Sequence, residues 1–148
     1  MEFIELIADF AKRHNLDDFA AEDGAAAFDI DGIVVTVVAA GDSLSIAADI
    51  GEPPVEGRAN FADLLLEANL QGDAFFAKAT DAAVYVIVRR LSLPSLGSEA
   101  FDSALESLVN QAEAWRRILA DFRPVAAAAA ADAKAEGPSF DTSGFMQV

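Results

Sequence analysis

Two stretches of the chain have apolar residues at every third or fourth position, which predicts two amphipathic helices. In residues 2–14 acidic positions separate the apolar ones, and His14 follows on the apolar side; the apolar members are Phe3, Leu6, Ile7 and Phe10. Residues 98–122 carry a longer apolar seam, which consists of Phe101, Leu105, Leu108, Ala112, Trp115, Leu119 and Phe122. A seam of that length predicts a helix that lies across a sheet.

Residues 25–50 predict a meander of three strands. Two-residue turns at Asp31–Gly32 and Gly41–Asp42 fit tight hairpins. Closing both hairpins at these turns gathers one apolar face, made of Phe28, Ile30, Ile33, Val35, Val37, Leu44, Ile46 and Ile50. The opposite face is semi-polar, and its members are Asp29, Val34, Thr36, Val38, Ser43, Ser45, Ala47 and Asp49. A shift of one residue would scatter the apolar set, so this register is the expected one.

A proline-containing loop, a further helix and a hairpin follow the meander. Asn60, with Asp63 three residues later, predicts the start of the helix, and Gly72 predicts its end. A hairpin is predicted over residues 75–91, and its apolar run at 84–88 is typical of a central strand. The order α-β-β-β-α-β-β-α predicts an α+β fold, an antiparallel sheet packed against helices.

The composition changes at Pro124, and this change predicts a domain boundary. Residues 1–122 hold all the predicted elements, whereas residues 123–148 are rich in alanine and small polar residues and have no apolar stripe. We therefore expect a flexible C-terminal tail. The acidic pairs Asp17–Asp18 and Glu22–Asp23 predict solvated loops.

The charge and the amino-acid composition exclude several classes of function. The 148 residues carry a formal net charge of -15, from 25 acidic and 10 basic residues, and include no cysteine. Such a field repels nucleic acid and anionic membranes, and thiolate chemistry is impossible. The acidic N-terminus does not resemble a signal peptide, and no apolar run approaches the ~20 residues of a membrane span. We therefore expect a protein of the reducing cytoplasm that binds neither nucleic acid nor membrane.

Residues that could perform catalysis or hold a cofactor are scarce. The single histidine, His14, follows Phe10 by one helical turn, which favours a structural or binding role. No metal-binding cluster and no glycine-rich phosphate loop is present, so we expect no cofactor, no metal and no enzyme. The stretch "FDIDG" (28–32) is similar to the DxDG motif of aspartate-nucleophile phosphatases, but Ile33 stands where a threonine is expected. The hairpin turn explains the same residues better, and an EF-hand calcium loop fits them worse.

The second helix has more leucines than one face can hold. If it is regular, Phe61, Leu65 and Ala68 form the stripe that covers the sheet. The remaining apolar side chains spread over other faces, and two phenylalanines after the helix extend the patch; the set is Leu64, Leu66, Leu70, Phe75 and Phe76. An exposed apolar patch of this kind predicts an interface, for which a two-fold homodimer is the commonest arrangement. The alternative is that the third helix or the tail covers the leucines.

Three segments now stand out together: "LIADFAKRHNL" in the first helix, "ANFADLLLEANLQG" in the second and "LESLVNQAEAWRRIL" in the last. With the element order, small size and acidity, they resemble the class I type III secretion chaperones, the CesT/SycE-like family. The resemblance covers roughly residues 3 to 122, and the alanine-rich tail departs from it. It implies a bacterial, cytoplasmic homodimer that binds the N-terminal segment of a secreted effector in extended form and keeps it ready for export. Components of the secretion apparatus are further implied partners.

The resemblance also implies two sites. The five apolar residues of the second helix and the strand after it become the dimer interface. The effector would be bound by the first helix and the semi-polar sheet face, through strand addition and side-chain pockets. The residues implied for effector binding are His14, Val34, Thr36, Val38, Ser45 and Ala47.

Three other interpretations remain open. One is a dimeric protein-binding module or adaptor of the same fold without a secretion role. Another is a phosphatase that uses Asp29 of "FDIDG". The third concerns regulation: Phe140 and Phe145 suggest that the tail occupies the effector groove until an effector displaces it.

Overall fold

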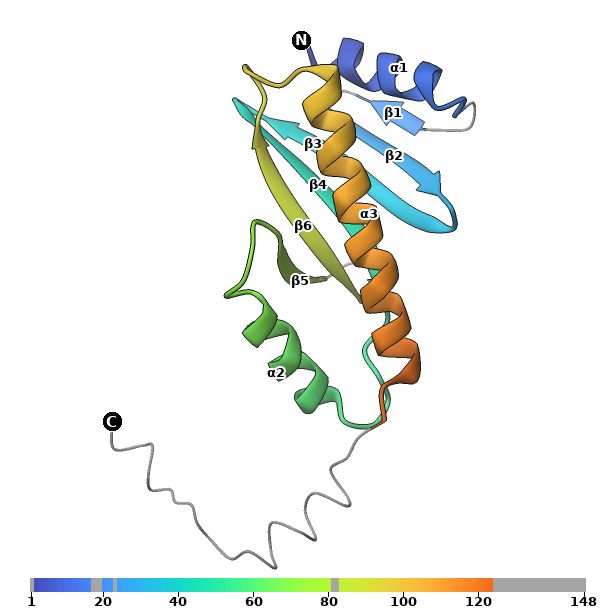
Figure 1. Ribbon diagram of the computed structural model, residues 1–148, viewed down its shortest axis with the longest axis vertical. Coiled ribbons are helices and arrows are strands. Elements are labelled where there is room, and N and C mark those ends of the chain that lie inside the picture. Colours follow the sequence, from blue (N-terminus) through green and yellow to red (C-terminus); the bar gives the residue numbers. More distant parts are fainter. Residues whose placement is uncertain (1, 17–19, 23, 81–82, 124–148) are drawn as a thin grey trace, which may run out of the picture.

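The computed structural model describes residues 2–16, 20–22, 24–80 and 83–123. Within these residues the helices are α1 (Phe3–Arg13), α2 (Arg58–Ala68) and α3 (Ser98–Asp121). The strands are β1 (Ala20–Glu22), β2 (Ala25–Ile30), β3 (Ile33–Ala40), β4 (Ser43–Gly51), β5 (Phe75–Ala79) and β6 (Val84–Ser92). They form one antiparallel sheet in the order β1-β2-β3-β4-β6-β5 (Figure 1). The predicted α+β class, with a sheet packed against helices, is therefore confirmed.

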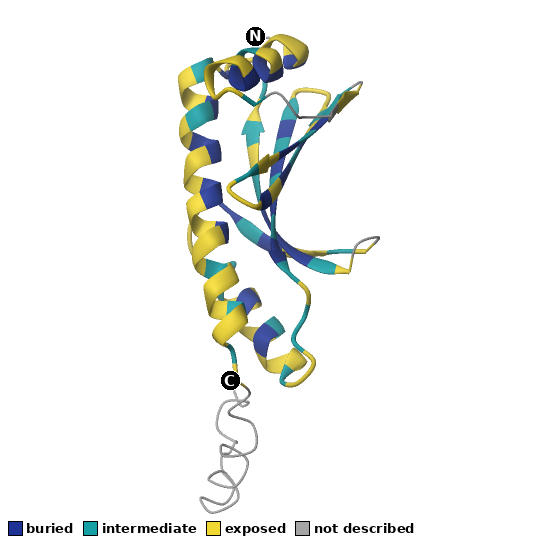
Figure 2. Ribbon diagram, turned by 90° about the vertical axis from the view of Figure 1, so that its right-hand side faces the viewer, coloured by how far each residue is buried: buried dark blue, intermediate teal, exposed yellow. Residues whose placement is uncertain are grey.

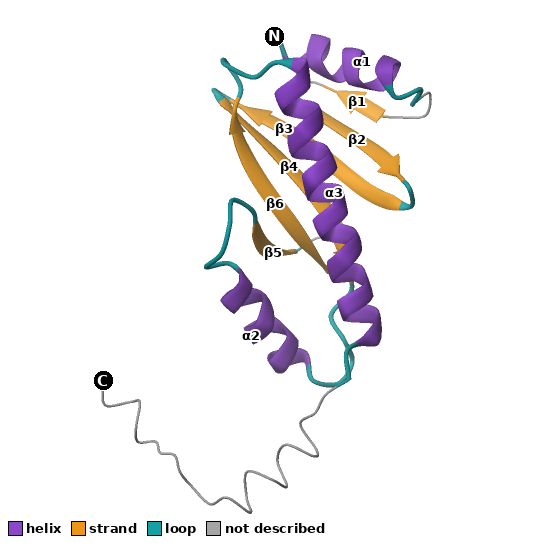
Figure 3. Ribbon diagram, viewed as in Figure 1, coloured by secondary structure: helices purple, strands orange, loops and turns teal. Residues whose placement is uncertain are grey.

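All three helices lie on the same side of the sheet. Helix α3 runs along the sheet, with α1 at its N-terminal end and α2 at its C-terminal end (Figures 2 and 3). The residues predicted for its apolar seam all pack in or against the core. The opposite side of the sheet carries no described helix, and we call it the open face.

The register of the meander is the one that the sequence predicts. Ile30 pairs with Ile33 across the first hairpin, and Val37 pairs with Ile46 across the second. Of the eight residues predicted for the apolar face, seven are buried and Ile30 is half-buried. Asp31 and Gly32 both have positive φ, 53° and 83°, as a turn of two left-handed residues requires.

Several boundaries differ from the prediction. Glu22 belongs to strand β1 and not to a loop; three residues are too few to show a period, and its exposed charged side chain suits an edge strand. Asn60 is not the N-cap, because α2 begins one turn earlier, after Gly57 in the left-handed conformation. The helix ends at Ala68, before Gly72, because the next backbone bonds, from Leu70 N–H to Glu67 and from Gln71 N–H to Ala68, span three residues and form turns.

The predicted tail, and with it Phe140 and Phe145, lies outside the described residues. The same is true of Asp17–Asp18 and Asp23. The boundary near residue 122 therefore stays a prediction.

Candidate protein-binding surfaces

The apolar residues of α2, together with Leu70 just after its end, divide into an inward and an outward set. Phe61 is fully buried, and its ring lies 5.1 Å from that of Phe122 and 5.6 Å from that of Tyr85, centroid to centroid. Leu65 joins it in the core, and Ala68 packs against it. The other leucines face solvent in the single chain: Leu64 is 37% exposed, Leu66 63% and Leu70 88%. We call these three the α2 patch.

Strand β5 continues from this region along the edge of the sheet. The side-chain amide of Asn69 bonds to the backbone of Phe76 twice: its oxygen accepts from the Phe76 N–H at 2.5 Å, and its nitrogen donates to the Phe76 carbonyl at 3.3 Å. The Phe76 ring is 9% exposed and meets Trp115 edge-on at 4.8 Å, so it is largely part of the chain's own core. Phe75 points to the open face, where the guanidinium of Arg90 lies 5.2 Å from its ring centre.

A groove of about 400 Å³ lies beside the α2 patch. Its walls come from α2, the start of β5 and the C-terminal half of α3, and are Leu64, Glu67, Ala68, Gln71, Ala74, Phe76, Gln111 and Trp115. The sequence does not predict this groove, because Gln111 and Trp115 lie far along the chain from the residues of its other wall. The sequence predicts that Phe76 belongs to the exposed patch. In the structure Phe76 instead forms part of the groove wall beside the patch.

Five of the six residues implied for effector binding lie together on the open face. Val34 and Val38 are 44% and 42% exposed, and Thr36 between them is half-buried. On the neighbouring strand Ala47 pairs with Thr36, and Ser45 pairs with Val38. The surface is therefore a shallow row of small and β-branched side chains. Burial raises the pKa of Asp49 at the end of this row, and Arg116 partly opposes the shift.

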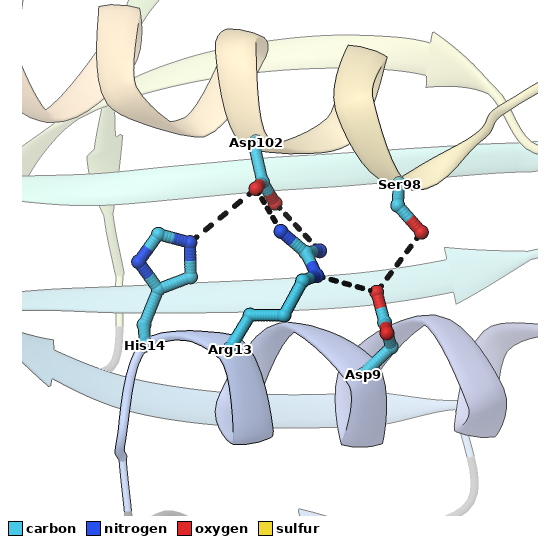
Figure 4. A network of polar contacts seen from close by, with 5 residues as sticks. All are labelled: Asp9, Arg13, His14, Ser98 and Asp102. Carbon is cyan, nitrogen blue, oxygen red and sulfur yellow. Dashed lines mark hydrogen bonds and ion pairs between the residues drawn. The ribbon is translucent and has the colours of Figure 1, made fainter.

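His14 is separated from those five residues, because it lies on the helix-covered side. Its ring stacks on Phe10 with the centroids 4.5 Å apart, and its Nε2 lies 3.3 Å from Oδ2 of Asp102 on α3 (Figure 4). Phe10 in turn packs edge-on against Phe28 and Phe101 in the core. The structure therefore divides the predicted effector-binding residues between two surfaces.

An ionic network around His14 ties α1 to α3. Both terminal nitrogens of Arg13 bond to Asp102, and its Nε donates to Asp9 at 2.8 Å (Figure 4). The hydroxyl of Ser98 donates to the same Asp9 carboxylate at 2.9 Å. Hydrogen bonds from Arg13 lower the pKa of Asp9 and of Asp102 below the ordinary aspartate value. Sequence reasoning missed this network, since its two halves lie about ninety residues apart.

The "FDIDG" stretch forms a turn rather than a paired-carboxylate site. Oδ1 of Asp29 accepts a hydrogen bond from the N–H of Gly32 at 2.9 Å, which closes the hairpin. In the described part of the chain, no group of three or more His, Cys, Asp or Glu residues is arranged to hold a metal ion. No described helix combines the length and apolar character needed to cross a membrane.

The domain has an open sheet face, an exposed apolar helix patch and grooves between elements. These features are typical of a domain that binds other polypeptides. The sequence matches the Tir chaperone protein (CesT) family over residues 5–116. The chain belongs to this family, and the resemblance drawn from its three helical segments is confirmed. No curated protein matches the sequence at a significant level.

Solved structures with the same fold include partner-bound complexes. The ExsC–ExsE complex has a chain that is 22% identical, with a TM-score of 0.67, over 78% of this chain and 91% of that one. The type III secretion chaperone SycH from Yersinia pestis, bound to a fragment of YscM2, is 22% identical with a TM-score of 0.58, over 75% and 97%. YbjN from E. coli, whose suggested role is transcription regulation, is 15% identical with a TM-score of 0.61, over 80% and 93%. At these identities the likeness concerns the fold.

Proposed function

We propose that this protein is a type III secretion chaperone, which binds the N-terminal segment of a secreted effector in extended form and keeps it export-competent in the bacterial cytoplasm. Membership of the Tir chaperone family over residues 5–116 carries the proposal. SycH, which shares the fold, is itself a type III secretion chaperone bound to a polypeptide fragment. Binding of this kind requires apolar surface and free backbone groups but no chemical step.

Two surfaces are proposed to hold the effector segment. The first is the row of Val34, Thr36, Val38, Ser45 and Ala47 on the open face, and the second surrounds His14. Val34 lies just after the Asp31–Gly32 turn, and Asp31 lines the hollows beside His14, so this turn lies between the two surfaces. An extended segment that passes over this turn would contact both.

The α2 patch is proposed as the core of a homodimer interface, together with Phe75 and Phe76. Burial of one leucine side chain contributes about 1.5–3 kcal/mol, so two copies of Leu64, Leu66 and Leu70 supply a substantial part of an association free energy. The groove beside the patch offers a place for the partner's leucines. Because most of the Phe76 side chain is buried, we propose that it packs beneath the patch.

The solution mass tests the dimer. We expect the wild type to have twice the chain mass of 15.5 kDa by light scattering, and Leu66→Glu to have the monomer mass. The matched control is Ile4→Glu, which places the same charge on an exposed apolar residue of α1 and should leave the dimer intact. A monomeric wild type, or a dimer that Leu66→Glu leaves intact, would exclude the α2 patch as the interface.

Deletion of the gene in its native bacterium tests the secretion role. A chaperone predicts that one or a few secreted proteins disappear from the medium and fall in the cell, while their transcripts stay constant. Reintroducing the wild-type gene should restore them. An unchanged set of secreted proteins under conditions that activate secretion would refute the proposal.

A second candidate function is a binding module of the same fold without a secretion role, and the similarity to YbjN favours it. In that case deletion should change transcript levels and leave export of existing proteins intact. The same deletion strain therefore separates the two functions.

A further inference from the structure

Two hollows adjoin each other beside the end of α1. They share Phe10, His14, Ile30 and Asp31, and have volumes of about 260 Å³ and 330 Å³. The first extends along α3 over Leu105 and Val109, and the second extends under Leu16. Phe10, Leu105 and Val109 are all buried, so the floor is apolar. Since a cavity of about 150 Å³ holds a benzene ring, each hollow admits one large side chain.

The rim of the hollows is acidic. Asp31 at the hairpin turn and Glu106 on α3 line it, and in the described part of the chain neither carboxylate takes part in a hydrogen bond or an ion pair. Asp102 also lines the first hollow, but Arg13 already neutralises it. Asp31 also lines a separate hollow with Arg116 and Arg117, where the Arg116 guanidinium donates to the Gly32 carbonyl at 3.0 Å.

We propose that these two hollows select an apolar side chain next to a cationic one, arginine or lysine, in the bound polypeptide segment. The apolar side chain fills one hollow, and the methylene stem of the cationic one lies over the other while its charged head reaches Asp31 and Glu106. The inference rests on the proposed function, because it specifies the chemistry of the segment bound at His14. The formal net charge of -15 adds attraction for such a segment.

The single histidine makes the test local, because its imidazole signals in an NMR spectrum of the full chain come from one site. The probe is the peptide acetyl-Ser-Leu-Leu-Arg-Leu-Ser-Gly-amide, titrated beside versions with Gln or Glu in place of Arg. We expect the arginine peptide to shift the His14 signals, and the glutamine peptide to bind about five-fold more weakly, as the loss of exposed ion pairs implies. The glutamate peptide should bind more weakly still.

Removing the two rim charges from the protein should have the same effect. The double variant Asp31→Asn with Glu106→Gln should raise the Kd of the arginine peptide about five-fold and abolish the preference for arginine over glutamine. Asparagine tolerates positive φ, so the turn at Asp31 is preserved. The control Asp42→Asn with Glu52→Gln removes equal charge elsewhere, and it should leave both values unchanged.

Three results would overturn the inference: equal affinity for the arginine and glutamine peptides, no shift of His14 with any peptide, or equal losses in both double variants. None of these results bears on whether the deletion strain loses secreted proteins. Failure of this inference and failure of the secretion role are therefore distinguishable.

Discussion

Replacing Asn69 with alanine should remove both hydrogen bonds that tie the end of α2 to strand β5. A hydrogen bond contributes about 0.5–1.5 kcal/mol net, and an orphaned buried partner costs about 1–3 kcal/mol. The Phe76 backbone is only partly buried, so water can replace some of the loss, and we expect about 1.5 kcal/mol less stability. Asn69 has right-handed helical backbone angles, which alanine adopts without strain, so the change isolates the side chain.

Trp115 provides the assay, since it is the only tryptophan and lies against the rings of Phe61 and Phe76. Its fluorescence during urea unfolding, at one fixed protein concentration, reports the junction of α2, β5 and α3. Gln71→Ala is the matched control, because it removes a nearby amide that makes no side-chain hydrogen bond among the described residues. If the Asn69 variant loses no more stability than this control, the two hydrogen bonds do not hold α2 in place.

Three other substitutions test the electrostatics and the packing. Arg13→Ala removes the cation that lowers the pKa of Asp102. The wild type gains stability from this interaction above about pH 4 and loses it on acidification. The variant should lack this stability, so its acid unfolding profile should be flatter than that of the wild type. Asp49→Asn should be more stable than the wild type at pH 7, because burial raises the pKa of Asp49; the gain should vanish below about pH 4, and equal stability at pH 7 would contradict it. Gly51→Ala should destabilise the protein by about 2 kcal/mol or more, because φ is 131° and a Cβ would lie 2.8 Å from Leu119 Cδ2; thermal unfolding measures this loss.

The sequence predicts the sheet meander well because two independent constraints agree there. The turns at Asp31–Gly32 and Gly41–Asp42 set one register, and the same register gathers the large apolar residues on one face, so a slip would violate both. Helix α2 is less predictable, since its start depends on the left-handed conformation of Gly57, which leaves no mark on the pattern. Strand β1 is missed because three exposed or small residues have no readable period.

The candidate sites, too, are predictable from the sequence only in part. The exposure of Leu66 and Leu70 is predictable, because a helix cannot bury leucines on all sides. The burial of Phe76 is not, since it depends on Trp115, which meets it only through the tertiary fold. The resemblance implies one effector site that His14 of the first helix shares with residues of the semi-polar sheet face. The contacts of His14 with Phe10 and Asp102 place it on the other side.

Helix α3 connects the two ends of the molecule, since Asp102 meets α1 and Phe122, just beyond its last turn, meets α2. Its 24 residues span about 36 Å at 1.5 Å per residue. If two copies join through α2, each His14 hollow lies toward the other end of α3, away from the interface, so an extended chain must run past both copies of α2 to reach the two hollows. A short peptide would then occupy each hollow independently. A longer client would gain avidity, because its second contact forms at a high effective concentration.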